Sequence, residues 1–551
     1  MIRTRLKGIL TECFKAGVTR HGWPEEAAGA FTVEQPKREG QGDLATNLAL
    51  VVAGRARQNP RVVAGQLVEL LCDCPLLDRM EIAGPGFVNF FIRPQVWQET
   101  LSEIAAQDAT FGKSQAGAGK RVLVEFVSAN PTGPLSVGHG RQAVLGDAIC
   151  RLLTATGHQV TREYYYNDAG RQMRVLAQSV RARYLELLGE PGQFPEDGYQ
   201  GQYIIDIARE LLAEEGERLR GADDLAPFKA KAERAIFADI NATLTRLGIH
   251  FDNYYNEHSL YDEGHIDEVV AELRAKGLVY EQEGAVWFKT TALGLDQDRV
   301  IIKSTGEPTY RLPDIAYHRE KFKRGFDWMV NIFGSDHIAT VPDVLAGVRA
   351  LGYDDSRVTV VLHQFVTLLR DGKQVKMSTR KATFVTVDEL LAEVGADVAR
   401  FFFLMRKADS QLEFDLTLAT QQSQENPVYY VQYGHARLCS ILRQADEKGL
   451  VKGESDQARL ALLTEPEELG LLKAISTYPE LVLDAARELA PHRVVFYLQE
   501  LAGQFHSYYN RHRVLGEDAA LSQARLALVD GLRIVLRNGL NLIGVSAPES
   551  M

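Results

Sequence analysis

The sequence predicts a multidomain α/β protein, in which a parallel-sheet domain lies between an α+β N-terminal part and an all-helical C-terminal part. Segments with strand and helix character alternate from residue 121 to about residue 408, which is typical of a doubly wound parallel sheet. Helices and a strand-like segment precede this region, and helical periodicity alone follows it. The chain has 551 residues, enough for about three or four domains.

Composition excludes several classes of protein. The formal net charge is -11, so local basic faces would have to meet any nucleic acid. The five cysteines form no Cys-x-x-Cys pair and no zinc-type cluster, which argues against a disulfide framework and a structural zinc site. The first residues, MIRTRLKGILTECF, are too polar for a signal peptide, and no run reaches the ~18 apolar residues of a membrane span. We therefore expect a cytoplasmic protein without a membrane segment.

Residues 1–112 are expected to form a separate module. Helical patterns cover residues 2–16, 44–56 and 62–71, and residues 80–92 are strand-like around a Gly-Pro-Gly turn. The basic residues of the module are Lys37, Arg38, Arg55, Arg57 and Arg61. Such a group is usually a solvated face, and RNA contact is the alternative.

The central domain, expected over residues 113–408, opens with a βαβ unit. Residues 122–127 have strand character, and a loop then leads to Gly138 and His139 at the start of a helix. Residues 159–166 follow as a second strand. Free N–H groups and the helix dipole favour a phosphate at such a helix start. We expect His139 to donate to a phosphate oxygen as charge develops there.

The remaining elements complete this architecture. Acidic helices interrupt the alternation between residues 178 and 303, which predicts an insertion between two halves of the sheet. The second half is expected as a strand at 328–333, a helix at 341–351 and further strand at 358–369. From residue 409 to residue 551 we expect no strands but a helical bundle, with helices at 426–444, 465–476, 478–489, 492–509 and 521–540.

A second candidate phosphate site is the loop that carries Lys376, Met377, Ser378, Thr379 and Arg380. It follows the last predicted strand of the sheet, and its cations suit a polyphosphate. A loop of this kind is often only solvated. Its position in the same α/β domain as the His139 loop favours a shared nucleotide site.

Two acidic residues lie at unusual places. Glu125 is in an otherwise apolar strand, and Asp314 is at the entrance to another element. An ionised carboxylate in a core strand is costly unless it is paired. A structural ion pair with one of the many arginines would satisfy it, and so would the forked donors of a ligand guanidinium. The residues alone leave both interpretations open.

The two loops resemble the HIGH and KMSKS motifs of class I aminoacyl-tRNA synthetases, and the sequence around them resembles the arginyl-tRNA synthetase branch. The phrases that carry the resemblance are VEFVSANPTGPL (124–135), YYNDAGRQ (165–172), KMSTR (376–380) and NPVYYVQYGHAR (426–437). The resemblance covers essentially the whole chain. It implies a Rossmann-type catalytic domain that joins L-arginine to its tRNA in two steps through arginyl-adenylate. ATP would be consumed, AMP and pyrophosphate released, and the amino acid activated only with tRNA bound.

The resemblance also implies roles for individual positions. The arginine substrate would contact Glu125, Ser128, Asn130, Tyr310 and Asp314, with Ser128 and Asn130 at its α-amino end. ATP would contact Gly138, His139, Gly334, Asp336, His337, Lys376, Met377 and Ser378, and the catalytic set would be His139, Lys376, Ser136 and Arg380. The segment 334–337 is also readily explained as structural. Mg2+ would come with ATP, and no prosthetic group or dedicated metal site is expected.

The helical tail resembles an anticodon-binding domain. Tyr430, Tyr433, His435 and Arg437 lie on or near one predicted helix, where aromatic residues are usually core but also suit stacking on unpaired bases. Met551 is a further position implied to contact tRNA. The N-terminal module resembles the domain that touches the outer corner of tRNA, and we expect a monomer because no long coiled-coil seam is present.

The sequence departs from the motifs at two positions. Ser136 stands in place of the first HIGH histidine, and Thr379 in place of the second lysine of KMSKS. Serine carries no positive charge and reaches less far, so slower activation is expected. These two positions are the support for an alternative function, a synthetase-like tRNA-binding or regulatory protein with weakened or lost activation. A small-molecule nucleotidyltransferase would not explain the helical tail or the N-terminal module.

Overall fold

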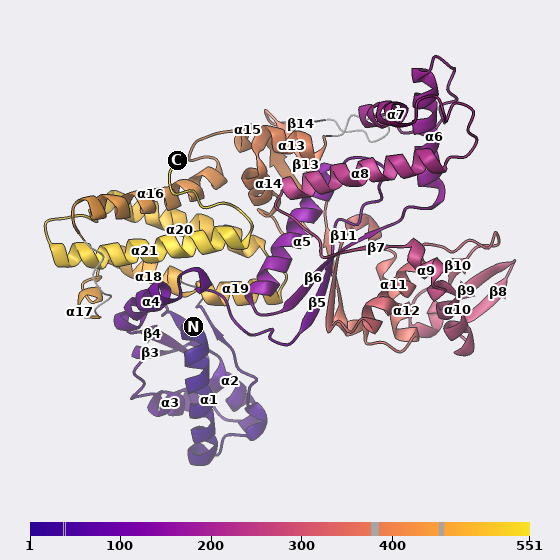
Figure 1. Cartoon of the computed structure of the whole chain (residues 1–551). Helices are drawn as coiled ribbons and strands as arrows, with labels where there is room; N and C mark the ends of the chain where they lie inside the picture. Colours follow the sequence, from indigo (N-terminus) through magenta and orange to yellow (C-terminus); the bar gives the residue numbers. More distant parts are fainter. Residues whose placement is uncertain (37, 39, 376–384, 451–456) are drawn as a thin grey trace.

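The computed structural model describes residues 1–36, 38, 40–375, 385–450 and 457–551. Its centre is a wholly parallel five-stranded sheet of order β12-β11-β5-β6-β7 (Figure 1). The strands are β5 (Arg121–Glu125), β6 (Gln159–Tyr166), β7 (Asn253–Asn256), β11 (Trp328–Gly334) and β12 (Val358–His363). The predicted fold class, a parallel sheet between an α+β part and a helical part, is confirmed.

The strand order reverses at β5. The chain runs from β5 to β6 and β7 on one side, and then returns to β11 and β12 on the other. The crevice at the carboxyl ends of β5 and β11 is therefore the topological switch point, where open α/β sheets bind ligands.

Alternation along β5 decides which side chains face which helices. Val122 and Val124 belong to the same core cluster as the buried face of α5 (Val137–Ala155). Leu123 instead packs in the cluster of α11 (Arg311–Lys323) and α12 (Val341–Ala350). Side chains two residues apart share a face, so Glu125 is directed toward α11, like Leu123.

The segment expected as an insertion forms a helical arm and a small sheet, but it does not lie wholly outside the central sheet. The arm is α6 (Gly170–Leu187), α7 (Gln202–Glu215) and α8 (Ala226–Arg246), and the later elements are α9 (His258–Asp262), α10 (His265–Ala275), β8 (Val279–Gln282), β9 (Ala285–Phe288) and β10 (Arg299–Ile302). Between them β7 pairs with β6 as the edge strand of the central sheet. The prediction missed β7 because its four residues, NYYN, contain no apolar run.

A second small sheet follows the central one. It contains β13 (Val366–Arg370), β14 (Lys373–Gln374) and β15 (Leu412–Asp415), with α13 (Val387–Val394), α14 (Ala396–Phe403) and α15 (Leu416–Ala419) beside it. Strand β15 pairs in parallel with β13, so the expectation that strands end at residue 409 was wrong. Its short sequence LEFD alternates apolar and polar residues, but four residues are too few to stand out from loop.

The N-terminal part is α+β, as expected. It contains α1 (Ile2–His21), α2 (Leu48–Ala56), α3 (Pro60–Leu70) and α4 (Pro94–Gln107), and a sheet of β1 (Val33–Glu34), β2 (Leu44–Thr46), β3 (Leu77–Ala83) and β4 (Phe87–Ile92). The helix predicted over residues 44–56 begins only at Leu48, because Leu44–Thr46 pairs with β4. Tertiary pairing here overrides a helix-compatible sequence.

The C-terminal part is helical throughout its described residues from Pro427 onward. It consists of α16 (Pro427–Glu447), α17 (Gln457–Leu460), α18 (Pro466–Ser476), α19 (Tyr478–Arg487), α20 (His492–Arg511) and α21 (Ala519–Leu542). The N-terminal part rests on this bundle through α4, which packs against α18 and α21 (Figure 1). Within the described ranges, no helix has the length and apolar character needed to cross a membrane.

Candidate active site

The backbone turns sharply where β5 ends. Val127 and Ser128 both have positive φ, 67° and 42°, a conformation that is rare for a β-branched residue. Such strained turns concentrate at functional sites. This turn brings the Ser128 hydroxyl back to the strand end, where Oγ donates to Glu125 Oε1 (3.1 Å) and accepts from the backbone N–H of Tyr165 (3.2 Å).

Glu125 is the acidic floor of the crevice. Its side chain is buried, and its Oε2 forms an ion pair with Nζ of Lys321 on α11 at 2.6 Å. The structural ion pair that the sequence left open therefore exists, with a lysine instead of an arginine. Among the described residues, Oε1 is hydrogen-bonded to Ser128, which leaves this oxygen with a lone pair for a ligand.

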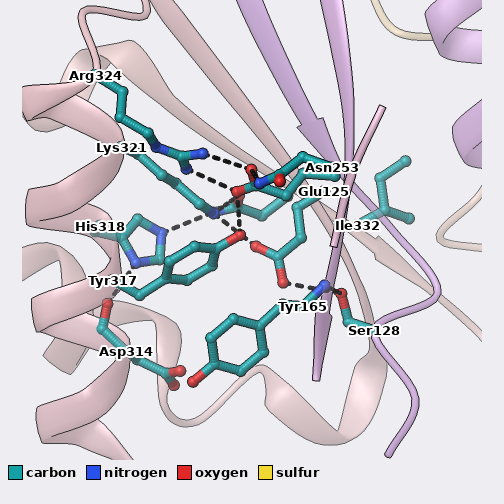
Figure 2. Close-up of polar contacts among 12 residues, drawn as sticks. Glu125, Ser128, Tyr165, Asn253, Asp314, Tyr317, His318, Lys321, Arg324 and Ile332 are labelled. Carbon is teal, nitrogen blue, oxygen red and sulfur yellow. Dashed lines mark hydrogen bonds and ion pairs between the residues drawn. The ribbon is translucent and has the colours of Figure 1, made fainter. Parts of the chain in front are cut away.

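Asp314 lies across the crevice in the first turn of α11. Figure 2 shows the side chains of Glu125, Tyr165 and Asp314 directed into one space between β5 and α11. Burial, and then the negative charges of Glu125 and Glu257, raise the pKa of Asp314 to about 7. A carboxyl group held in this state is destabilised as an anion until a cation joins it. Tyr310, at the entrance to α11, is 87% exposed.

Asn130 is engaged with the phrase that follows β6. Its Oδ1 accepts from the N–H of Asn167 at 3.0 Å, and its Nδ2 donates to Gln172 Oε1 at 3.1 Å. The loop after β5 is thereby tied to the segment 167–172.

The start of α5 carries a reciprocal cap. Ser136 is the N-cap residue, and its Oγ accepts from the N–H of His139 while its own N–H donates to His139 Nδ1 (3.2 Å). Nδ1 is thus the acceptor nitrogen, which assigns the proton of a neutral ring to Nε2. Burial lowers the pKa of His139, opposed by the charge of Asp336, so the ring is neutral at pH 7. A neutral His139 presents an Nε2–H donor at the helix start, beside Gly138.

The end of β11 approaches the same helix start. Gly334 ends the strand, and a short 3-10 turn, Ser335–His337, follows. Gly334 has no Cβ, and the carboxylate of Asp336 folds back into the space that a Cβ there would occupy. The charge of Asp336 acts on His139, which is consistent with the end of β11 lying near the start of α5.

The predicted residues Lys376, Met377, Ser378 and Arg380 lie outside the described residues. The flanks of their loop are described. The N–H of Val375 donates to Leu368 O on β13, and Thr386 forms a β-bridge with Ser136. The described residues before and after this segment, Val375 and Thr386, therefore lie beside β13 and at the start of α5.

Arg141 connects α5 to these flanks. It is 1% exposed, and its guanidinium donates to Gln364 O (2.7 Å), Lys407 O (2.9 Å) and Ser410 O (2.9 Å). Gln364 precedes β13 and Ser410 precedes β15. One side chain therefore fixes the small sheet against the first helix of the site.

The predicted tRNA-contacting residues divide into two groups. Tyr430, Tyr433 and Arg437 are half-buried beside His506 of α20, with ring centroids 4.6 Å (Tyr430) and 5.9 Å (Tyr433) from the histidine. Arg437 Nη2 donates to the Tyr433 hydroxyl at 2.6 Å. Met551 is exposed.

His435 does not belong with that group. It is 1% exposed, and its Nδ1 lies 2.9 Å from Pro548 O, so it fastens the chain end to α16. The sequence left both a core role and a base contact open for His435, and its burial in the bundle favours the core role.

Sequence reasoning missed several residues of the crevice: Tyr165, Glu257, Lys321, Asn331 and Arg141. A signal was present for two of them. Lys321 lies two helical turns after Asp314, on the same face of α11. Asn331 interrupts an otherwise apolar strand, WMVNIFG, where a polar side chain needs a buried partner. The others had no local pattern.

Comparisons with known proteins agree with this arrangement. Three family models match the chain in order: Arginyl tRNA synthetase N terminal domain over residues 2–92, tRNA synthetases class I (R), catalytic domain over 100–412, and DALR anticodon binding domain over 431–551.

Full-length relatives carry one description. An arginine–tRNA ligase of Desulfotalea psychrophila is 65% identical over 552 residues and covers 100% of both chains. One of Salinibacter ruber is 53% identical, covering 94% of this chain and 95% of the relative. The structure of Thermus thermophilus arginyl-tRNA synthetase shares the fold, with a TM-score of 0.77 at 24% identity over 100% of both chains. None of these findings favours the regulatory alternative. The chain belongs to the arginyl-tRNA synthetase family, the class I ligases that use ATP to charge tRNA with arginine.

Proposed function

We propose that arginine and ATP react at the carboxyl ends of β5 and β11. The observation that carries this assignment is the meeting, at the topological switch point, of the buried Glu125, the partly buried Asp314 and the start of α5. A guanidinium suits the carboxylates, and a phosphate suits the helix start. Glu125, Asp314 and Tyr310 bind the guanidinium, and Ser128 and Asn130 hold the α-amino end.

The reaction proceeds in two transfers. A carboxylate oxygen of arginine forms a bond to the α-phosphorus of ATP, and the bond from that phosphorus to the bridging oxygen breaks, so that pyrophosphate leaves with the electron pair. The terminal ribose hydroxyl of tRNA then attacks the carbonyl carbon, and AMP leaves. Positioning and charge stabilisation provide most of the catalysis in such reactions.

His139 and its surroundings hold the nucleotide. Its Nε2–H donates to a phosphate oxygen, and Gly138, Gly334, Asp336 and His337 contact ATP. Lys376, Met377, Ser378 and Arg380 are assigned to the same phosphates; the support is that Thr386 lies beside Ser136 and Val375 lies beside β13. Ser136 acts mainly by capping α5 and orienting His139.

Mg2+ enters as part of the ATP substrate. In the described part of the chain, no three His, Cys, Asp or Glu side chains are grouped so that they would hold a metal ion. The ion would neutralise charge on the pyrophosphate as it leaves.

The other parts of the chain handle the tRNA. We assign residues 1–112 to its outer corner, residues 113–408 with β15 to catalysis, and residues 409–551 to the anticodon, with Tyr430, Tyr433, Arg437 and Met551 as contacts. Half-buried aromatic rings beside an arginine are a suitable platform for unstacked bases. The enzyme acts as a cytoplasmic monomer.

The test is arginine-dependent exchange of pyrophosphate into ATP, with and without tRNA. We expect exchange only with tRNA, and a KM for arginine that rises roughly ten- to hundredfold in Glu125→Gln, because a charge-assisted contact to the guanidinium is lost. The matched control is Glu281→Gln, at an exposed carboxylate on β8. Pyrophosphate exchange that does not depend on arginine, or an unchanged KM for arginine in Glu125→Gln, contradicts the proposal.

A further inference from the structure

A lysine lies behind the floor of the crevice. Lys321 is 0% exposed, although lysine is almost never fully buried without partners. Its ammonium donates to Glu125 Oε2 (2.6 Å) and Asn331 Oδ1 (2.8 Å), and it lies 4.0 Å from the centroid of the Tyr317 ring. The charge is thus held entirely by groups of the protein interior (Figure 2).

A chain of directed hydrogen bonds fixes this lysine. Asn331 receives the ammonium on Oδ1 and has Nδ2 2.7 Å from Nε2 of His318. Nδ1 of His318 lies 2.7 Å from Asp314 O. Burial lowers the pKa of His318 to about 3, so its ring is neutral, with Nε2 accepting from Asn331 and Nδ1–H donating to the carbonyl. The chain therefore joins the lysine to the backbone of the second acidic residue of the crevice.

A second layer closes the network on its outer side. Tyr317 donates its hydroxyl to Glu163 at 2.5 Å, and Arg324 makes a two-pronged contact with the same carboxylate (2.5 and 2.7 Å). Glu163 also accepts from Asn253 of β7 at 2.6 Å. The side chains that surround Lys321 have little freedom to follow a ligand.

The two carboxylate oxygens of Glu125 have different partners. Lys321 occupies Oε2 and Ser128 orients Oε1, so the carboxylate has one rotamer and one oxygen turned to the crevice. The pairing also sets the charge. Glu125 and Glu257 both place negative charge near Asp314, and the Lys321 ammonium offsets one of these charges.

We propose that Lys321 is a positioning residue of the arginine pocket, which favours a guanidinium by fixing Glu125 and neutralising one of the pocket's negative charges. This inference rests on the proposed guanidinium contacts of Glu125 and Asp314. Without the ammonium, a buried Glu125 is left unpaired and is favoured to take up a proton. A protonated Glu125 donates a hydrogen bond where the pocket previously only accepted. It would then donate a hydrogen bond to the carbonyl oxygen of citrulline, the neutral urea analogue of arginine.

The experiment compares Lys321→Met with Arg400→Met. Arg400 forms an equally buried pair with Asp147 (2.5 Å), which joins α14 to α5 away from the crevice. Both variants lose the cation of a buried pair, so both are expected to unfold at lower temperature. Only Lys321→Met is expected to raise the KM for arginine, by roughly tenfold or more, with the KM for ATP unchanged. The ratio of the citrulline inhibition constant to the arginine KM should fall by a similar factor.

A second variant covers the case in which Lys321→Met does not fold. Asn331→Asp keeps the lysine and the shape of the side chain but draws the ammonium away from Glu125. It is expected to raise the KM for arginine in the same exchange assay.

Two outcomes overturn the inference. In the first, Lys321→Met loses thermal stability like Arg400→Met but keeps the wild-type KM and the wild-type discrimination against citrulline. In the second, Asn331→Asp folds and also leaves the KM for arginine and the discrimination against citrulline unchanged. Glu125→Gln separates this failure from that of the proposed function. If it raises the KM for arginine while the Lys321 variant does not, only the role of Lys321 is wrong; if it has no effect, the pocket itself is misassigned.

Discussion

Asp314 is the residue whose ionisation is expected to depend most on binding of a cationic ligand. Its carboxyl pKa is raised to about 7 by burial and by the neighbouring anions Glu125 and Glu257, against the opposing charge of Lys321. A carboxyl whose pKa is raised on folding costs stability once the pH exceeds its unfolded value near 4. The residue is therefore expected to serve binding at the expense of the stability of the empty protein.

Asp314→Asn should show this trade. We expect the KM for arginine to rise roughly ten- to hundredfold, because an ion pair to the guanidinium is lost. The thermal midpoint of the empty protein should stay the same or rise at pH 8, where the wild-type carboxylate is ionised, with less change at pH 4. Pyrophosphate exchange and thermal unfolding at the two pH values measure both effects. A midpoint that falls at pH 8 would show that Asp314 stabilises the fold instead.

The same residue predicts how arginine binding depends on pH. A guanidinium binds the ionised form of Asp314, so the KM for arginine should fall as the pH rises from 6 to 8, with its midpoint near the pKa of about 7. The charged or titratable groups around Asp314 are Glu125, Glu257, Lys321, Tyr165 and Tyr261. Burial raises the pKa values of both tyrosines, so neither ionises in this range. A KM that does not change with pH in the wild type, or that changes equally in Asp314→Asn, would assign the titration elsewhere.

Ser136 has a structural task that the motif comparison did not reveal. Replacing an N-cap serine costs about 1 kcal/mol of stability, and this applies to both Ser136→Ala and Ser136→His. Only the histidine variant adds a donor near the phosphates, so it should exchange pyrophosphate faster than Ser136→Ala and faster than wild type. Stability is measured by denaturant unfolding and the rate by exchange. If Ser136→His is no faster than wild type, serine is not a deficiency at this position.

Among the elements, long apolar segments were predictable and short ones were not. Strands β6 and β11, helix α5 and the helices of the tail fall where the sequence patterns placed them, because their buried faces repeat with the period of the element. Strands β2, β7 and β15 have three or four residues each, and pairing with a distant partner decides them. The local sequence does not encode that partner.

The site follows the same division. Glu125, Ser128 and His139 stand beside a recognisable strand, loop and helix, so the sequence identifies their segment. The ion pair of Glu125 with Lys321 joins residues 196 positions apart and follows only from the packing of α11 on β5. Tyr165 and Glu257 likewise meet through the pairing of β6 with β7. Contacts of this kind are properties of the tertiary structure.

Helix α5 should control the second loop through Arg141. Arg141→Met removes three hydrogen bonds to the backbone carbonyl groups of Gln364, Lys407 and Ser410 and should loosen the small sheet of β13, β14 and β15. Small displacements of catalytic groups are costly, so kcat for exchange should fall roughly ten- to hundredfold, with less change in the KM for arginine. Arg151→Met, on the same helix but partly exposed, is the control. Equal losses of kcat in both variants would contradict a specific role for Arg141.

The N-terminal part packs against the helical bundle, and the bundle packs against the first helix of the catalytic domain. Helix α4 rests on α18 and α21, and Arg3 bonds Asp484 of α19 at 2.9 Å. Helix α19 in turn packs against α5 (Figure 1). A tRNA held by the bundle is thereby connected to the first helix of the site through packed elements.

The rings of Tyr430, Tyr433 and His506 in the bundle are a candidate surface for stacking on tRNA bases. Tyr433→Ala should raise the KM for tRNA about five- to hundredfold, since stacking on one base contributes roughly 1–3 kcal/mol. The KM for arginine, measured with saturating tRNA, should not change, because the crevice is untouched. Aminoacylation kinetics with varied tRNA measure the effect. An unchanged KM for tRNA would return Tyr433 to a purely structural role.

A crystal structure of the protein with arginine bound tests the assignment of the arginine pocket most directly. We expect the guanidinium to lie between Glu125 Oε1 and Asp314, within hydrogen-bond distance of both. Lys321 should still be paired to Oε2, and the arginine carboxylate should be directed toward His139. A guanidinium bound at another acidic group, such as Asp336, or a Glu125 side chain that leaves Lys321 to meet the ligand, would contradict it.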